Sequence, residues 1–339
     1  VMVLRDASLT LAIALQLVSL AWIIQRFSVA GLSWIFKGLV TIVIIRLTLN
    51  PWLTSYPDDV HWSLWTFGGS TLCCVLAWRL LRPFAAIARW AEGAALHLLV
   101  LTLLAETRYW LSDGDMFGAA ISSTEVALYM ALAGALSVVY RIRAGASANL
   151  KRVYNLYARL LYGGAFLCYL TIATHTLESS LWVWAEIGTT PIFNLLLLFF
   201  ALPVVLALLN YRVHEGRFRS AALYFAGVAG FVCVSLEITH LWQGEIRLDN
   251  GYSSGELYTY SAVWLVLAMA AMLAGLWRYG AGVYKAGLIL LGLVVAKLFL
   301  WDMSGLEGLL RIASFMGLGL CLLGVAYLNQ RLAPPEREA

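Results

Sequence analysis

The last third of the chain places several ionisable side chains at one end of its apolar segments. Glu237 and His240 are three residues apart and therefore share one face of a predicted helix. Glu256 opens the next apolar segment, and Lys297 lies about one turn before the end of a later one. Charged groups inside a membrane span are costly and are functional candidates by default. We therefore predict an outward-facing polar pocket, with these ligand-binding candidates: Lys297, Arg311, Asp302, Glu307, Trp301 and Tyr258.

Three kinds of function fit this cluster. In the first, Lys297 and Arg311 hold a lipid-linked, anionic or sugar-bearing ligand in a binding or transport-type protein. In the second, an enzyme acts on a lipid-linked substrate, with Glu237 or Glu256 as general base and His240 as proton carrier. In the third, Glu237 and Glu256 pair with the cations and pin the helix ends of a structural subunit. The catalytic assignment stays open among Glu237, His240 and Glu256.

Glu237 and His240 also form a Glu-x-x-His motif. Di-iron bundles use two such motifs, but the matching earlier position in this chain is Tyr109, so we expect no di-iron site. A single metal ion held by Glu237, His240 and Glu256 is a remote alternative, and we predict neither metal nor cofactor. His97 has no evident axial partner and is interpreted as a hydrogen-bonded core histidine.

An earlier part of the chain resembles this stretch. Residues 121–129 align without a gap on residues 252–260, at the 131-residue offset that separates 125 from 256. The same shift carries Glu106 onto Glu237. The earlier copy keeps Glu106, Arg108 and Glu125. The places in it that correspond to Lys297 and Asp302 are occupied by apolar residues. We therefore predict two repeats and place the site in the later one.

The composition explains where these elements must lie. The chain has 339 residues, of which 62% are hydrophobic and 12% charged, and its mean hydropathy is +0.81. Soluble domains carry about 25% charged residues, so the class is all-α polytopic membrane protein. We expect about eleven transmembrane helices, at residues 6–25, 32–50, 62–81, 86–110, 120–140, 152–173, 189–210, 220–241, 257–277, 283–301 and 308–329.

The predicted organisation follows from the repeat. A three-helix segment spans 1–83, repeat A spans 84–213, repeat B spans 219–332, and 333–339 form a polar tail. Each repeat has four helices, an even number, so the two copies run parallel.

Charge in the connections predicts the orientation. Connections rich in Arg and Lys alternate with acidic, aromatic ones, and basic loops remain in the cytoplasm. The C-terminus is therefore expected inside and the N-terminus outside. The net charge of +4 is spread between helices, which argues against nucleic-acid binding. Membrane lipids are the expected partners, together with other envelope proteins or an upstream part of a longer chain.

The segment from Lys297 to Leu320, with the closing residues 326–331, resembles the C-terminal signature of a family of predicted bacterial membrane proteins, DUF2339. The surroundings of His240 and Tyr260 are similar to it too. The resemblance implies a bacterial inner-membrane location and supplies no activity or catalytic residues. Family members are typically longer, so it also implies a missing N-terminal part.

Overall fold

The computed structural model describes residues 6–27, 31–49, 61–146, 150–177, 187–246 and 251–298, with single positions 316, 319, 320, 323, 324 and 327. The regular elements in these ranges are helices. The chain divides into two compact units, Val1–Ala185 with Arg212–His214, and Glu186–Tyr211 with Glu215–Ala339. The predicted repeat boundaries at 84 and 213 describe similarity between parts of the sequence, whereas this division describes compactness. The repeat boundaries therefore stay predictions.

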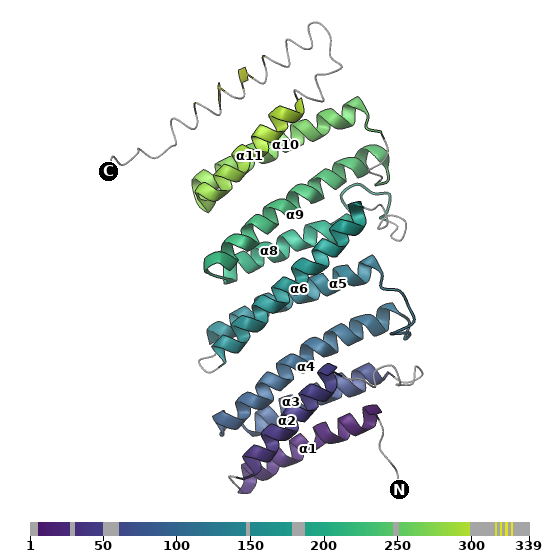
Figure 1. Cartoon of the computed structure of the whole chain (residues 1–339), viewed down its shortest axis with the longest axis vertical. Helices are drawn as coiled ribbons and strands as arrows, with labels where there is room; N and C mark the ends of the chain where they lie inside the picture. Colours follow the sequence, from purple (N-terminus) through teal and green to yellow (C-terminus); the bar gives the residue numbers. More distant parts are fainter. Residues whose placement is uncertain are drawn as a thin grey trace, which may run out of the picture. The chain divides into compact units, whose positions relative to one another are not determined.

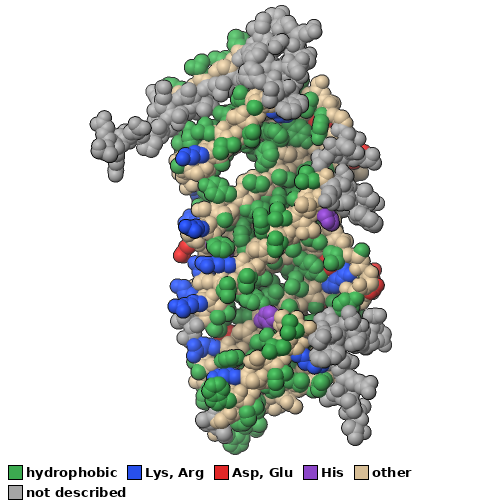
Figure 2. All heavy atoms as spheres, in the orientation of Figure 1, with side chains coloured by type: hydrophobic (Ala, Val, Ile, Leu, Met, Phe, Trp, Pro, Cys, Tyr) green, Lys and Arg blue, Asp and Glu red, His purple; other side chains and the backbone are tan. Residues whose placement is uncertain are grey.

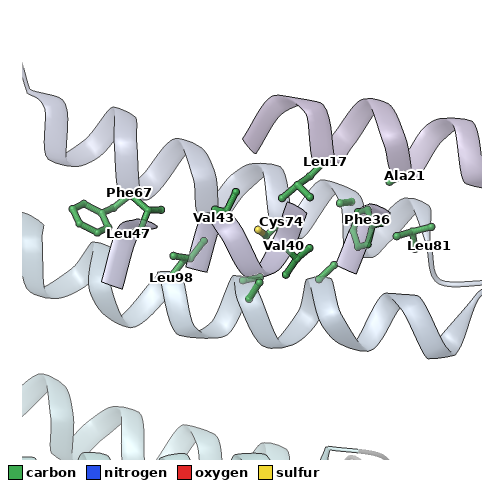
Figure 3. Packing of buried hydrophobic residues seen from close by; sticks show 14 of the residues in the cluster. Leu17, Ala21, Phe36, Val40, Val43, Leu47, Phe67, Cys74, Leu81 and Leu98 are labelled. Carbon is green, nitrogen blue, oxygen red and sulfur yellow. The ribbon is translucent and has the colours of Figure 1, made fainter. Parts of the chain in front are cut away.

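In unit 1, four helices surround one apolar core (Figure 1). The helices are α1 (Asp6–Phe27), α2 (Leu32–Leu49), α3 (Gly69–Leu80), which continues the π-helical turn η2 (Leu64–Gly68), and α4 (Ala85–Leu111). Figure 3 shows Leu17 of α1, Phe36 of α2, Cys74 of α3 and Leu98 of α4 at successive places along this core. All four are at least 99% buried, and close-packed apolar contact of this kind holds such bundles together.

The second part of unit 1 is the helix pair α5 (Ser123–Ala146) and α6 (Lys151–Leu177). The buried Ser137 hydroxyl of α5 donates to the Ala158 carbonyl of α6 at 2.8 Å. The Tyr140 hydroxyl donates to the Leu96 carbonyl of α4 at 2.5 Å. Side-chain hydrogen bonds of this kind link helices where water is absent.

Unit 2 begins with the π-helical turn η3 (Leu197–Ala201), which runs into α8 (Leu202–Val213). The change from π to α geometry falls beside Pro203, whose missing N–H interrupts the helical ladder. Next come α9 (Gly216–Gln243), α10 (Ser254–Ala274) with the π-helical turn η4 (Gly275–Tyr279), and α11 (Ala281–Lys297).

A glycine sets the spacing of α10 and α11. A Cβ atom at Gly287 of α11 would lie 2.8 Å from the backbone nitrogen of Met272 and 2.9 Å from the carbonyl oxygen of Ala268. Only glycine therefore allows this approach of the two backbones, as small residues do in membrane helix pairs.

Seven helices among the described residues are long and apolar enough to cross a membrane. They are α1, α2, α4, α5, α6, α9 and the continuous helix Ser254–Tyr279. The predicted multi-helical membrane architecture is therefore confirmed at this level. The predicted eleventh span, 308–329, lies outside the described residues apart from single positions.

Candidate functional site

The start of α10 carries a buried carboxylate. Ser253 is extended and its hydroxyl accepts the backbone N–H of Glu256 at 3.2 Å, which makes it the N-cap of α10. Glu256 is 1% exposed and accepts two contacts from the Gln243 amide nitrogen, at 3.0 and 3.2 Å. The carboxylate thus lies at the positive end of a helix dipole, beside a neutral donor.

One turn and a half before the end of α9, Glu237 binds the segment that precedes η3. One carboxylate oxygen, Oε2, accepts the backbone N–H of Ile192 and the side-chain amide of Asn194, each at 3.2 Å. The other oxygen, Oε1, is buried and has no hydrogen-bond partner among the described residues. An unsatisfied buried carboxylate oxygen is costly.

His240 fastens the same segment to α9. It is 2% exposed, its Nε2 lies 2.9 Å from the carbonyl of Gly188, and its Nδ1 lies 3.4 Å from the Asn194 amide nitrogen. A carbonyl only accepts and an amide nitrogen only donates, so these contacts correspond to a neutral ring protonated on Nε2. The Glu237–His240 pair therefore acts here as an anchor for the chain before η3.

Lys297 ends α11 and reaches across to α10. Its ammonium donates to the Leu257 carbonyl at 2.9 Å and to the Ser261 hydroxyl at 2.7 Å. Glu237 and Glu256, which the structural-subunit hypothesis pairs with the cations, bind Asn194 and Gln243 rather than Lys297. Lys297 lies level with Ser261, more than one turn into α10, whereas Glu256 lies in its first turn.

A cavity of about 350 Å³ lies beside this ammonium, between α9, α10 and the end of α11. Tyr260 and Trp264 form an aromatic wall, with ring centroids 5.5 Å apart. The Tyr260 hydroxyl donates to the Ser235 carbonyl at 3.1 Å, and the Trp264 indole donates to the Ser235 hydroxyl at 3.0 Å. The remaining lining residues are Leu236, Thr239, Tyr252 and Leu257. Hydrogen bonds to α9 thus hold the wall in place before any ligand binds.

Unit 1 has a comparable arrangement. Glu106 accepts from His61 Nε2 and from the Ser63 hydroxyl, each at 2.9 Å, and His61 stacks on Tyr109 at 3.8 Å between centroids. The Ser122 hydroxyl accepts the backbone N–H of Glu125 at 3.2 Å, as Ser253 does for Glu256.

The carboxylate of Glu125 has different partners from that of Glu256. It is 1% exposed, pairs with Arg108 at 2.6 Å and accepts the Tyr129 hydroxyl at 2.6 Å. Arg108 also donates to the carbonyl oxygens of Met116 and Ala119. The ion pair therefore fixes the connection between α4 and α5.

The predicted site residues thus fall into separate groups. Glu237 and His240 meet through Asn194, Glu256 binds Gln243, and Lys297 faces the aromatic cavity. Tyr258 is 42% exposed. Within the described ranges, no group of three or more His, Cys, Asp or Glu residues could hold a metal ion. The predicted candidates Trp301, Asp302, Glu307 and Arg311 lie outside the described residues.

Asn194, Gln243, His61 and Ser63 are polar partners that the sequence reasoning missed. A signal for two of them was present, because the 131-residue shift also carries Ser63 onto Asn194. His97, by contrast, is hydrogen-bonded as expected, with its Nε2 2.8 Å from the Thr48 hydroxyl and its Nδ1 against the Tyr157 hydroxyl.

A family model described as "Predicted membrane protein (DUF2339)" matches residues 1–332. The chain belongs to this family. The match extends well beyond the last hundred residues, where the distinctive motifs were noted, and covers α1 to α11. Comparison with curated proteins and with solved structures gives no match. DUF2339 membership establishes an uncharacterised membrane protein family and no activity.

Proposed function

We propose that this DUF2339 protein binds a lipid-linked ligand with an anionic or sugar-bearing head group in the cavity of unit 2. The observation that carries the proposal is the ammonium of Lys297 at the edge of a cavity walled by Tyr260 and Trp264. A cation held near a membrane surface suits a phosphate, and aromatic faces suit a sugar ring or an isoprenoid chain.

The position of Lys297 supports an anionic ligand. Its ammonium is held by a carbonyl and a hydroxyl, which are neutral acceptors, and neither Glu237 nor Glu256 bonds to it. These contacts hold Lys297 on the lining of the cavity, where an anion that enters would be attracted by its positive charge.

The cavity supports binding more than catalysis. Its lining within the described part of the chain contains no Asp, Glu or His. A general base must come within hydrogen-bond reach of the proton that it removes. Glu237 and His240, the catalytic candidates on α9, are instead turned toward Asn194. A membrane enzyme acting on a lipid-linked substrate, or a structural envelope subunit, remains the alternative to a binding or transport-type role.

We also infer that the protein consists of two parallel repeats within about eleven spans. The matched serine caps of α5 and α10 support this, as do the π-helical turns before α3 and α8. In unit 1, Glu106 near the end of α4 accepts a hydrogen bond from Ser63, which precedes η2 and α3. In unit 2, Glu237 near the end of α9 accepts one from Asn194, which precedes η3 and α8. These contacts suggest that each repeat begins with α3 or α8, one helix earlier than the sequence suggested.

The family resemblance supports a bacterial inner-membrane location, and the charge pattern supports an orientation with the cavity at the periplasmic face. Arg79, Arg143 and Arg212 lie in the last turns of α3, α5 and α8, next to the connections that lead into α4, α6 and α9. The positive-inside rule assigns these connections to the cytoplasm. Lys297 and Glu256 lie at the opposite helix ends, and the C-terminus is then inside and the N-terminus outside.

The test compares Lys297→Gln with Lys285→Gln, a control that removes an exposed cation near the other end of α11. A polyprenyl phosphate is titrated into protein in detergent, and bound lipid is counted by native mass spectrometry. We expect Lys297→Gln to weaken binding about tenfold, as for loss of one charge-assisted hydrogen bond, and the control to bind normally. Equal binding by both variants and the wild type would overturn the proposal.

A second substitution distinguishes the head groups. Trp264→Ala removes an aromatic face but leaves Lys297 unchanged. If a sugar-bearing lipid is the ligand, this variant loses more affinity for the glycosylated lipid than for the bare polyprenyl phosphate. Equal losses for the two lipids would exclude sugar stacking at this wall.

A further inference from the structure

A second cavity, of about 590 Å³, lies in unit 1 and plays no part in the proposed function. It is bounded by α2, α4 and the beginning of α6. Lys37 of α2 and Arg89 and Trp90 of α4 line it, together with the apolar residues Ile44, Ala94 and Val153. Two cations, one indole and an aliphatic wall therefore meet in one space.

The depth of this cavity matches that of a lipid head group. Lys37 is the sixth residue of α2, Arg89 the fifth of α4 and Val153 the third of α6. At about 1.5 Å per residue, all three lie within roughly 10 Å of the same ends of their helices. Within unit 1, Figure 2 shows Lys and Arg side chains mainly along the edge at which α4 and α6 begin. By the positive-inside rule, this end faces the cytoplasm.

Neither cation has an acidic partner among the described residues. Lys37 lies over the Trp34 ring, 4.6 Å from its centroid, and Arg89 donates to the Ala85 carbonyl at 3.2 Å. The nearby carboxylate of Glu92 is already bound, by Arg143 at 3.2 Å and by the Tyr154 hydroxyl at 2.6 Å. No carboxylate among the described residues therefore neutralises Lys37 or Arg89.

The apolar part of the cavity determines what kind of anion fits. Val153 is 52% exposed and Trp90 is 44% exposed. The cavity is therefore open to the medium around the helices at these two residues. A Cβ atom added at Gly93, which also lines the cavity, would meet nothing within 4 Å. A free phosphate would leave this groove empty, whereas an acyl chain would fill it.

We propose that this cavity binds one anionic phospholipid of the cytoplasmic leaflet, with its phosphate between Lys37 and Arg89 and an acyl chain along Gly93 and Val153. Basic pockets between helices on the cytoplasmic side suit such head groups. The Trp90 indole lies at the level where amphipathic aromatic rings anchor to the interface. The site lies within unit 1 and shares no residue with the cavity beside Lys297. It rests on the membrane orientation proposed above and not on the ligand proposed there.

The experiment uses the full chain, purified in detergent and titrated with phosphatidylglycerol and, separately, with phosphatidylcholine. Native mass spectrometry counts the lipids retained. The test variant is Lys37→Gln/Arg89→Gln, and the control is Lys151→Gln/Arg152→Gln, which removes two exposed cations at the start of α6 that do not line the cavity. We expect the test variant to bind phosphatidylglycerol about tenfold more weakly, and the control to bind it as the wild type does.

A second variant keeps both charges. Gly93→Leu fills the groove from an open helix position and is expected to weaken phosphatidylglycerol binding without unfolding α4. Its melting temperature provides the folding check. The proposal is overturned if phosphatidylcholine binds as tightly as phosphatidylglycerol, or if both double variants lose affinity for phosphatidylglycerol equally. It is also overturned if Gly93→Leu binds both inorganic phosphate and phosphatidylglycerol as tightly as the wild type does.

Discussion

The side-chain amide of Asn194 lies 3.2 Å from Glu237 Oε2 and thereby joins the chain before η3 to α9. The same amide group contacts His240 Nδ1 at 3.4 Å, while its oxygen accepts the backbone N–H of Leu196 at 2.8 Å. One side chain therefore accepts a backbone N–H of its own segment and contacts two groups on α9. Its loss would affect both the chain before η3 and α9.

Asn194→Ala is expected to destabilise unit 2 by about 1–3 kcal/mol, because it leaves a partly buried carboxylate and a buried imidazole with fewer partners. Thermal unfolding in a fixed detergent measures the change. Thr190→Ala is the matched control, since its hydroxyl makes an exposed hydrogen bond to Phe193 in the same segment. Equal melting temperatures for the two variants would refute the linking role of Asn194.

Arg108→Met is expected to cost about 3–5 kcal/mol, because it leaves the buried Glu125 carboxylate without its cation. Adding Glu125→Gln should recover part of the loss, since the second change removes the uncompensated charge. Arg143→Gln serves as a comparison. Its pair with Glu92 is half-exposed and is expected to contribute about 0–1 kcal/mol. The prediction fails if Arg108→Met and Arg143→Gln have similar unfolding curves.

Gly287→Ala and Gly292→Ala should have opposite effects on the same helix. At Gly287 the new methyl group meets the backbone of α10, so the helices must separate and stability falls by about 1–3 kcal/mol. At Gly292 nothing lies within 4 Å, so alanine should stabilise α11 by about 0.5–1 kcal/mol. Melting temperatures that move in the same direction for both variants would contradict the close packing of α10 on α11.

Ser253→Ala removes the N-cap of α10 and is expected to cost about 0.5–2 kcal/mol. Ser253→Asp keeps an acceptor at the cap and adds a charge that the helix dipole favours, so it should retain most of the stability. The readout is thermal unfolding, with the Ser122 variants as the equivalent pair in unit 1. If Ser253→Asp melts as low as Ser253→Ala, then the cap hydrogen bond does not determine stability here.

Hydropathy was enough to find the long described helices, because a membrane span needs a long apolar run and the sequence has few competing patterns. The predicted segment 189–210 was wrong at its start, because it is helical only from residue 196 onward. The predicted segment 86–110 differs by one residue at each end from α4, Ala85–Leu111. The predicted segment 62–81 is less regular in the structure, where η2 precedes α3. Hydropathy does not distinguish a π-helical turn from an α-helical one.

The partners of the site residues were harder to predict. The sequence did not predict that Lys297 would bind the backbone carbonyl of Leu257, an acceptor that every residue type offers. Glu237 was expected to face the pocket, yet it turns to Asn194, which lies 43 residues away in the chain. Contacts between a loop and a helix depend on where the loop returns, and hydrophobic periodicity does not encode that path.

Several links between helices have a side-chain donor on one helix and a backbone acceptor on the other. Ser137 binds the Ala158 carbonyl, Tyr140 the Leu96 carbonyl and Lys297 the Leu257 carbonyl. Only the donor in each link depends on residue type, so substitution at the acceptor position can leave the bond intact. In an alignment of the family, the donor positions should therefore vary little, whereas the acceptor positions should vary freely and should not covary with them. Methods that infer contacts from paired substitutions would miss these links.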